Sequence, residues 1–298
     1  MQALNFENEK FEITEPFKGL FTQGMVCHET YKDSKNNWVS PEEIITKGGE
    51  KYLKNNTTEL VKVGPSESMS KSKKNTIDPE NIMNNYGADA VRLFILSDSP
   101  PEKDVQWSEE GMSASFKFIQ KLWGLHNKIL REVEQDHPDT NNEELNKFTH
   151  KFIKKITDNL NNFSYNIVIA NMHEMYAFLF KEIEKKYSKV TILENYKKIL
   201  ITVMPVIPHF SNECLENIGF NNKLSWPIYD EKFVEDKNAL IVIQVNGKKR
   251  GLVTLPKNSS ENELLKKIMK DEKIFKYIEG KKIKKKIFIK DKLINVIV

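Results

Sequence analysis

A short polar segment carries the residues of this sequence that are best suited to chemistry. The segment 68–72 (Ser-Met-Ser-Lys-Ser) places Lys71 between small hydroxyl residues, and Lys73, Lys74 and Asn75 follow it directly. A lysine ammonium can stabilise negative charge that develops on a phosphate group, and serines let the backbone approach such a group and offer it donors. The plainer interpretation is a solvated loop of lysines and serines, since patterns of five residues also occur by chance.

The elements on either side of this segment decide where its lysine is held. Gly19–Cys27 is an apolar run that predicts a short buried strand. Gly64-Pro65 indicates a turn into 66–75, which lacks periodicity and is therefore expected to be a loop. Asp78-Pro79 predicts the start of a helix, because Asp caps helices and Pro is favoured at the first helical position.

Two further stretches complete this first region. Lys32–Asn37 and Asn55–Thr58, with Trp38 and Val39 between them, are polar and are expected to form an excursion on the surface. Gly87 is expected to end the helix that begins at Pro79, and 88–96 to form another helix.

The region from about Gly111 to Glu235 is predicted to be helical throughout, because apolar residues recur in it at helical spacing. The expected core positions are Ile119, Leu122, Trp123, His126, Leu130, Val133, Leu145, Phe148, Phe152, Ile156, Met172, Met175, Leu179, Ile192, Tyr196, Ile199 and Val203. Asn141, with Glu144 three residues on, and Ser164 are expected caps. Pro205 and Pro208 are expected to bend or end the fourth helix. Four amphipathic helices predict a bundle.

Residues 240–298 predict a small domain of their own. Asn246-Gly247 is a strong hairpin signal, and Ser260 with Glu263 has the pattern of a capping box before a helix. The expected strands on either side are 240–245, 251–255, 283–289 and 293–298. The order strand, strand, helix, strand, strand indicates a compact α+β domain.

The chain as a whole is therefore expected to be multidomain, joining an α/β part, an all-α part and an α+β part. The expected boundaries are 1–110, 111–235 and 236–298, with the last boundary in the polar stretch Glu231–Asn238. A chain of 298 residues is long enough to form several domains with cores.

Charge is distributed unevenly along the chain. From Leu240 to Val298 there are 16 basic and 6 acidic residues, a net of +10, whereas the remainder has 30 basic and 36 acidic residues, a net of −6. A strongly basic module on a mildly acidic body suggests a polyanionic partner. A solvated lysine face is the alternative, so charge alone leaves nucleic-acid binding open.

Several classes of protein are not indicated. Met1–Glu15 lacks the basic start and apolar middle of a signal peptide, and no apolar run approaches the length of a membrane span. Cys27 and Cys214 are far apart in sequence, which fits a reducing cytoplasm. Cys27-His28 is not expected to bind a metal, since no partners recur at zinc-like spacing. Packing is the expected role of His209 and Trp226.

The segment 68–72 closely resembles the signature loop of class I aminoacyl-tRNA synthetases. The family pattern begins with lysine, so Ser68 is a departure, whereas the following Met-Ser-Lys-Ser is intact. Residues 15–26 resemble the strand that precedes the loop in leucyl enzymes, and 86–94 and 107–111 resemble the helix and connection that follow it. The resemblance continues to the end of the chain. It implies the C-terminal piece of a Rossmann-type catalytic domain, a helix bundle and a ββαββ terminal domain.

The continuation of the loop distinguishes among class I enzymes. Those for valine, isoleucine and methionine usually continue with Ser-Leu-Gly-Asn or Ser-Arg-Gly-Asn, whereas 72–75 here is Ser-Lys-Lys-Asn, which resembles leucyl enzymes. Residues 243–251 and 292–298 resemble the bacterial leucyl C-terminal domain. Residues 38–41 resemble the leucine-specific insertion, much reduced here, at about 28–63. A fragment of the valyl, isoleucyl or methionyl type is the alternative.

The resemblance implies ATP-dependent activation of leucine, with Mg²⁺ accompanying ATP, and transfer of leucine to tRNA(Leu). Lys71 is in the family position that contacts the pyrophosphate side of ATP, and Met69, Ser70 and Ser72 shape the loop around ATP. Lys73 or Lys74 is a hypothetical source of the charge that the lysine missing at position 68 supplies in the family.

The resemblance also implies that the bundle braces the tRNA backbone and that the terminal domain touches the tRNA elbow. The residues expected to contact tRNA are Lys248, Lys249, Arg250, Lys284, Lys286 and Lys290. In a strand, the last three would share one face, where they could contact phosphates or 2′-hydroxyls.

The family's His-Ile-Gly-His-type motif, its leucine pocket and its editing domain are not in this sequence. The chain alone is therefore not expected to make leucyl-adenylate. It is expected to be one subunit that pairs with an N-terminal catalytic and editing chain, a truncated gene product, or a stand-alone tRNA-binding module. The intact loop favours the first two interpretations.

Overall fold

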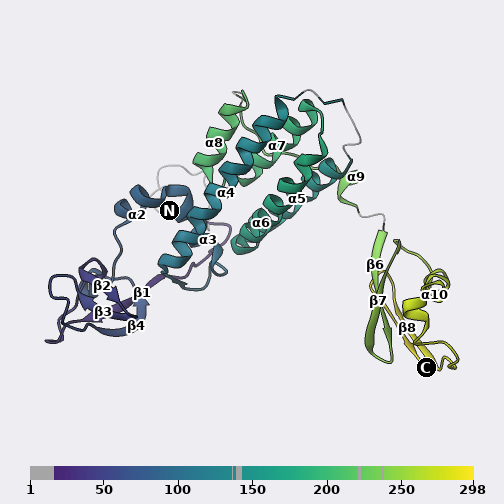
Figure 1. Ribbon diagram of the computed structural model, residues 1–298, viewed down its shortest axis with the longest axis horizontal. Helices are drawn as coiled ribbons and strands as arrows, with labels where there is room; N and C mark the ends of the chain where they lie inside the picture. Colours follow the sequence, from purple (N-terminus) through teal and green to yellow (C-terminus); the bar gives the residue numbers. More distant parts are fainter. Residues whose placement is uncertain (1–16, 136, 139–142, 221–222, 236–237) are drawn as a thin grey trace, which may run out of the picture. The chain divides into compact units, whose positions relative to one another are not determined.

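The computed structural model describes residues 17–135, 137–138, 143–220, 223–235 and 238–298 (Figure 1). These residues form a mixed α/β protein with two compact units, the first ending at Tyr229 and the second beginning at Asp230. Within the described residues, no helix is both long enough and apolar enough to cross a bilayer.

A three-stranded sheet in the first unit carries the segment of interest. Its strands are β1 (Val26–Lys32), β4 (Lys62–Ser68) and β5 (Val105–Gln106), in the order β4-β1-β5. β4 pairs with β1 antiparallel, and β5 pairs with β1 parallel over two residues. The central strand therefore receives hydrogen bonds from chain segments that come before and after the polar loop.

The strand predicted at Gly19–Cys27 is wrong in its position. β1 begins at Val26, and Leu20 in the preceding segment is 90% exposed. The apolar run has no strand beside it among the described residues, so its hydrophobicity alone does not make it a strand. Gly24 instead passes against the backbone of Lys103, so closely that a Cβ atom would collide with it. The Gly24 N–H donates to the Pro101 carbonyl at 2.8 Å.

The turn predicted at Gly64-Pro65 is also wrong, because both residues lie inside β4. β4 is an edge strand, where proline is tolerated, since one side of its backbone is not needed for the sheet. Glycine at 64 allows a close approach to Thr30, whose hydroxyl donates to the Pro65 carbonyl at 3.1 Å. The predicted loop at 66–75 is therefore shorter, since Ser66–Ser68 belong to the strand.

The stretch between β1 and β4 folds back as a hairpin with a small core. It contains a 3-10 turn η1 (Pro41–Glu43) and the paired strands β2 (Ile44–Lys47) and β3 (Glu50–Leu53). Tyr31, Val39 and Val61 are buried together. The surface excursion predicted here is thus partly wrong, because Val39 is a core residue, whereas the polar residues around it are largely exposed.

Two short helices follow the loop as predicted. They are α2 (Pro79–Tyr86) and α3 (Ala88–Ser97), separated by Gly87 at φ 79°. The Asp78 side chain accepts a hydrogen bond from the Glu80 N–H at 3.0 Å, which caps α2. Leu93 of α3 packs into the bundle core, and Phe94 packs in a smaller cluster with Val105 and Met112, so this helix contributes to both cores.

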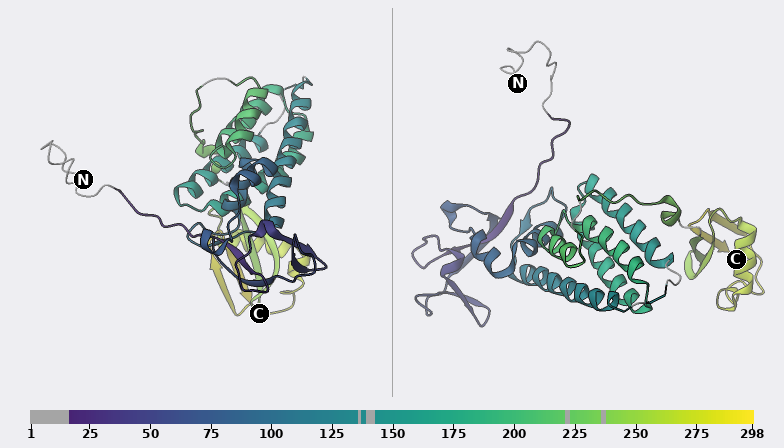
Figure 2. Two further views of the ribbon diagram at one scale, coloured as in Figure 1. Left: turned by 90° about the vertical axis from the view of Figure 1, so that its left-hand side faces the viewer. Right: turned by 90° about the horizontal axis from the view of Figure 1, so that it is seen from above.

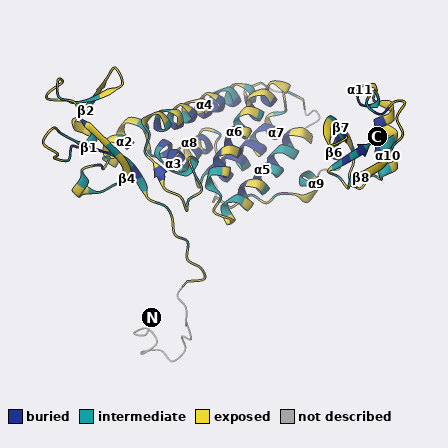
Figure 3. Cartoon of the chain, turned by 90° about the horizontal axis from the view of Figure 1, so that it is seen from below, coloured by how far each residue is buried: buried dark blue, intermediate teal, exposed yellow. Residues whose placement is uncertain are grey.

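The helical region forms a bundle whose members lie side by side (Figure 1 and Figure 2). Its helices are α4 (Glu109–Val133), α5 (Glu143–Asn161), α6 (Tyr165–Glu182), α7 (Lys189–Val203) and α8 (Pro208–Asn217), with a 3-10 turn η3 (Ile183–Lys185) after α6. Buried positions concentrate on these helices, whereas β4 is mostly exposed (Figure 3). α7 ends before Pro205, as the prolines predict, and Pro208 is the first residue of a further helix, α8, that the sequence did not predict.

The predicted buried face of α4 is partly wrong. Leu125 and Ile129 are buried, whereas Trp123 is 38% exposed. The cap predicted at Asn141 lies outside the described residues. Ser164 occupies the cap position of α6, but no hydrogen bond from its side chain caps the helix.

The second unit is a four-stranded sheet with helices against one face. Its elements are α9 (Glu231–Val234), β6 (Asn238–Val245), β7 (Lys248–Pro256), α10 (Glu261–Lys270), α11 (Glu272–Phe275), β8 (Lys285–Ile289) and β9 (Leu293–Ile297). The strand order is β7-β6-β9-β8, with β6 and β9 parallel in the centre. Ser260 and Glu263 form the predicted capping box. Asn246 and Gly247 both have positive φ, as a two-residue hairpin turn requires.

Candidate active-site loop and basic surface

The loop after β4 begins as a continuation of the sheet. The Met69 N–H donates to the Val26 carbonyl at 3.0 Å, which extends the pairing of β4 with β1 by one residue. A 3-10 turn, η2 (Lys71–Lys73), follows. Lys74 closes it in the left-handed region at φ 52°, with its N–H on the Lys71 carbonyl at 3.2 Å. The backbone thus turns sharply and presents 70–74 outward.

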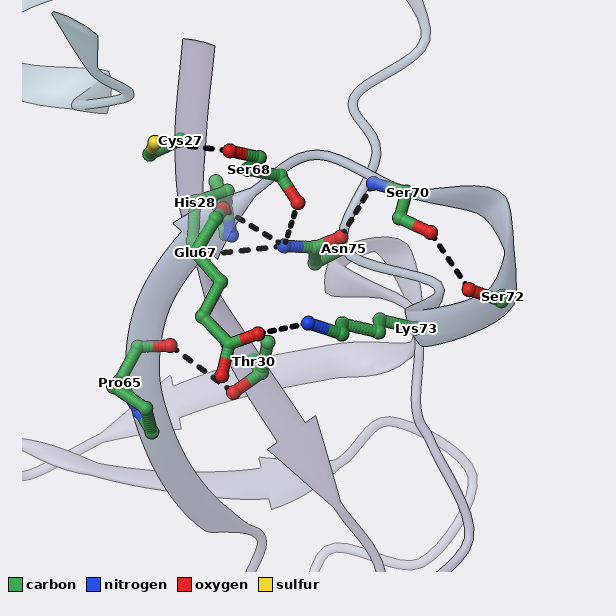
Figure 4. A network of polar contacts seen from close by, with 10 residues as sticks. All are labelled: Cys27, His28, Thr30, Pro65, Glu67, Ser68, Ser70, Ser72, Lys73 and Asn75. Atoms are coloured by element: carbon green, nitrogen blue, oxygen red, sulfur yellow. Dashed lines mark hydrogen bonds and ion pairs between the residues drawn. The ribbon is translucent and has the colours of Figure 1, made fainter. Parts of the chain in front are cut away.

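The side chain of Asn75 holds this turn against the sheet (Figure 4). Its Oδ1 accepts the Ser70 N–H at 2.8 Å. Its Nδ2 donates to the carbonyls of Glu67 at 3.1 Å and His28 at 3.2 Å, with the Ser68 carbonyl at 3.5 Å. Asn75 is fully buried. Asn75 is not identified as a structural residue by the sequence alone. The available indication was its position, an asparagine between the polar loop and the residue that caps the next helix.

The predicted loop residues differ in what they contact. Lys71 and Ser72 are exposed, and the Ser70 and Ser72 hydroxyls lie 2.7 Å apart. Lys73 forms an ion pair with Glu67, so its charge is partly neutralised within the chain. Lys71 and Lys74 have no ion-pair partner among the described residues, and both can face a ligand in solvent. Of the two hypothetical sources of extra charge, Lys74 is therefore the more available.

The position that departs from the family pattern lies at the end of β4. Ser68 is exposed, and its hydroxyl is 4.0 Å from the buried Cys27 thiol. A serine here contacts the sheet and contributes no charge. The lysines at 71 and 74 are therefore the exposed cations of the loop.

A second set of polar contacts joins the helix after the loop to the bundle. Asp89 of α3 accepts hydrogen bonds from the N-terminal end of α8, and Arg92 of α3 donates to the Pro205 carbonyl at 2.6 Å and the Val206 carbonyl at 3.0 Å. α3 therefore contacts both the turn between α7 and α8 and the start of α8. Sequence reasoning missed both roles, because the partners are more than a hundred residues away. His209 lies at this contact, where helix packing was its expected role.

The basic residues of the second unit are not equally available. Lys248 and Lys249 are exposed at the start of β7. Arg250 lies over the ring of Tyr277 at 4.1 Å from the centroid, so it packs within the unit. Lys286 forms an ion pair with Glu261 of α10 at 2.6 Å.

The three lysines expected on one face lie at and beyond the ends of β8. Lys286 lies directly across from the buried Val296 in the pairing of β8 with β9, so both side chains lie on the face of the sheet that the helices cover. β8 is an edge strand, so Lys286 lies at the edge of that face. Lys284 precedes β8, and its N–H donates to the Ile297 carbonyl at 2.8 Å. Lys290 lies in the turn after β8. The strand predicted at 283–289 is thus shorter, and the strand spacing used for Lys290 does not apply.

No group of three or more His, Cys, Asp or Glu side chains able to hold a metal ion occurs in the part of the chain that the structure describes. Cys27 and Cys214 are both buried free thiols. Trp226 donates its indole N–H to the Thr157 hydroxyl at 2.9 Å, but it is 39% exposed, so the packing role expected for it is only partly met.

Comparisons with known proteins agree with this arrangement. The family model for class I tRNA synthetases (I, L, M and V) matches residues 51–108, and the model for the anticodon-binding domain of tRNA ligase matches residues 142–267. The first match includes the loop and the helices after it. The second includes α5 to α8 of the bundle, without α4, and extends into the second unit.

Two relatives are leucine–tRNA ligases of Rickettsia. The protein of Rickettsia bellii is 41% identical over 295 residues, and that of Rickettsia massiliae is 40% identical over 296 residues. Each alignment covers 98% of this chain but 35% of the relative. The chain thus spans about a third of the length of the relatives it matches.

A solved structure shows the same fold. The LeuRS of Agrobacterium radiobacter, crystallised in a ternary complex with tRNA and LeuAMS, matches 99% of this chain and 35% of its own chain, with a TM-score of 0.71 at 22% sequence identity. The alignment with the leucine ligases runs through the polar loop, the bundle and the basic terminal unit. The chain is therefore similar, over nearly all of its length, to about a third of a leucine–tRNA ligase, and it matches the class I tRNA synthetase and anticodon-binding families in turn.

Proposed function

We propose that this chain supplies the pyrophosphate-handling loop and the tRNA-binding parts of a leucine–tRNA ligase. The N-terminal two thirds of such a ligase would provide the remaining ATP site, the leucine pocket and the editing domain, and the assembled enzyme would work in the cytoplasm. The observation that carries the proposal is Lys71, exposed on a turn that is held to the sheet from both ends, in a chain aligned with leucine ligases over 98% of its length.

The proposed reaction explains why a lysine is needed. A carboxylate oxygen of leucine attacks the α-phosphorus of ATP. The bond between the α-phosphorus and the oxygen that bridges it to the β-phosphorus breaks, and pyrophosphate leaves with the bonding electrons. Negative charge grows on the departing group, so the Lys71 ammonium interacts more strongly with the transition state than with bound ATP. Met69, Ser70 and Ser72 would shape the loop around ATP. Mg²⁺ would arrive with the phosphates of ATP.

The remaining parts of the chain would hold tRNA(Leu). The match of 142–267 to the anticodon-binding domain of tRNA ligase supports tRNA binding. The excess of basic residues after Leu240 supports contact of the second unit with RNA phosphates. In this proposal the chain has three functional parts, with boundaries near 110 and 235. The available residues Lys248 and Lys249 would contact the tRNA together with Lys284, Lys286 and Lys290.

The test is a reconstitution. The chain is mixed with the N-terminal two thirds of a leucine–tRNA ligase, and leucine-dependent ATP–pyrophosphate exchange is measured. The proposal requires exchange with the pair and none with either part alone, and it requires leucine rather than valine, isoleucine or methionine. Binding of tRNA(Leu) without any exchange would instead show a tRNA-binding module, and exchange with another of those amino acids would reassign the substrate.

A further inference from the structure

Asn75 differs from the loop residues around it in both burial and contacts. It is fully buried, whereas Lys71, Ser72 and Lys74 are exposed. Its side chain reaches the Ser70 amide at one end of the turn and the carbonyls of β1 and β4 at the other (Figure 4). One side chain thus ties both ends of the turn to the sheet.

The chemistry of these contacts selects an amide. Each neighbour of Oδ1 and Nδ2 has a fixed role, because Ser70 offers an N–H and His28 and Glu67 offer carbonyl oxygens. Asparagine supplies one acceptor and two N–H donors, which matches this set. Aspartate would place an oxygen against the carbonyls, and alanine would leave buried backbone groups without partners.

The position of Ser70 connects this network to the proposed catalytic lysine. Ser70 directly precedes Lys71, so the hydrogen bond to its N–H fixes the backbone from which the lysine side chain projects. The Met69 N–H on the Val26 carbonyl fixes the chain one residue earlier. Between these anchors and Asn75, only 70–74 extends away from the sheet.

We infer that Asn75 is a positioning residue for Lys71. Its buried side chain holds the turn, so that the Lys71 ammonium reaches the departing group without a search through other loop conformations. The catalytic half of this inference rests on the proposed function, whereas the structural half concerns the chain alone.

The structural half is tested on the intact chain by amide hydrogen exchange. In Asn75→Ala and Asn75→Asp, exchange at Ser70 should be at least about 10-fold faster than in the unchanged chain, because the turn is no longer tied to the sheet by the amide side chain. Exchange in α7 should be unchanged. Asn84→Ala, an exposed asparagine on α2, is the matched control and should leave Ser70 unaffected.

The catalytic half is tested by pyrophosphate exchange in the reconstituted pair. Asn75→Ala should lower kcat by about 10- to 100-fold, the effect of a misplaced catalytic group, with little change in the KM for leucine. In a Lys71→Ala background the same substitution should cost less than about 3-fold, because the group that it positions is already absent. A role in folding alone would lower activity equally in both backgrounds.

The outcomes separate the two ideas. If the Ser70 amide exchanges its hydrogen as slowly in Asn75→Ala as in the unchanged chain, the positioning role is overturned and the proposed function is untouched. Equal losses of kcat with and without Lys71 would overturn the link between the two residues. An unsubstituted pair that performs no leucine-dependent exchange would overturn the proposed function, and the catalytic half with it, even where the Ser70 amide responds as expected.

Discussion

Asp89 on α3 caps α8 by accepting hydrogen bonds from both the backbone and the ring of His209. Its Oδ1 accepts the His209 N–H at 3.3 Å and lies 2.9 Å from Nδ1 of the ring, while its Oδ2 accepts the Phe210 N–H at 2.6 Å. The carboxylate is nearly buried, at 7% exposure for the residue. The second helix after the polar loop is thereby fixed to the bundle.

Asp89→Ala should destabilise the first unit by about 2–3 kcal/mol, because it leaves two N–H groups at the start of α8 without an acceptor. Urea unfolding followed by circular dichroism measures the change. Asp98→Ala, at the exposed end of the same helix, is the control and should cost less than about 0.5 kcal/mol. Equal stability of the two variants would mean that the cap contributes little.

Lys71→Ala should lower kcat for pyrophosphate exchange in the reconstituted pair by about 100-fold or more, because it removes one charged donor to the departing group. Binding of tRNA(Leu) should change less than about 2-fold, a factor worth roughly 0.4 kcal/mol. Lys47→Ala, an exposed lysine at the end of β2, serves as the control and should leave both quantities unchanged. Undiminished exchange by Lys71→Ala would remove the catalytic assignment.

Lys284→Glu combined with Lys286→Glu should weaken tRNA binding and flatten its dependence on salt. The slope of log K against log salt should become shallower by roughly 0.7 to 0.9 for each RNA phosphate that the protein no longer neutralises. Filter binding across a salt series measures this. Lys285→Glu is the matched control, since Lys285 pairs with Ile297 on the opposite face of β8. Circular dichroism must accompany the assay, because Lys286→Glu also faces Glu261. Binding that is unchanged at every salt concentration would contradict RNA contact here.

His126 should make the bundle less stable in mild acid. It is fully buried beside the Tyr196 hydroxyl, at 3.1 Å, and burial lowers its pKa below the ordinary value of 6.5. Below pH 6.5 the unfolded chain binds a proton that the folded chain resists. The free energy of unfolding should therefore be fully retained above pH 6.5 and fall as the pH drops toward the lowered pKa, by at most about 1.4 kcal/mol per pH unit for one proton.

The measurement is chemical unfolding between pH 5 and pH 8, a window that spans the ordinary pKa of histidine. His126→Gln should reduce the slope of unfolding free energy against pH. Burial also lowers the pKa of His173, so the double variant with His173→Gln should be flatter still. A slope that survives in the double variant would place the titration elsewhere.

The sequence predicts best where a few neighbouring residues decide the structure. Asp78-Pro79 starts α2, Asn246-Gly247 turns the hairpin, and Ser260 with Glu263 caps α10, each as predicted. All three depend on local backbone chemistry. Helical spacing also predicts the bundle, but it gives four helices where the described residues form five, and 223–230, which were expected to be helical, are not.

The failures concern residues whose neighbours are distant in sequence. Gly19–Cys27 looks like a strand, but a strand needs a partner, and the described pairing begins at Val26. Gly64-Pro65 looks like a turn, but the approach of Thr30 keeps it extended in β4. The roles of Asn75 and Asp89 depend on carbonyls and amides that lie far along the chain. No local sequence pattern shows which distant backbone groups will come within hydrogen-bonding reach of these side chains.

In the four-stranded sheet of the second unit, the parallel pairing of β6 with β9 sets the order in which the strands can fold. β6 can form its hairpin with β7 as soon as the turn at Asn246 is made, since those contacts are local. The other side of β6 pairs Val242 with Leu293, so it waits for β9 to be synthesised. Until then the nascent hairpin carries an open edge. During translation this unit therefore acquires its second central strand last, and a ribosome that stalls before Leu293 leaves a hairpin with an unpaired strand edge in place of the complete sheet.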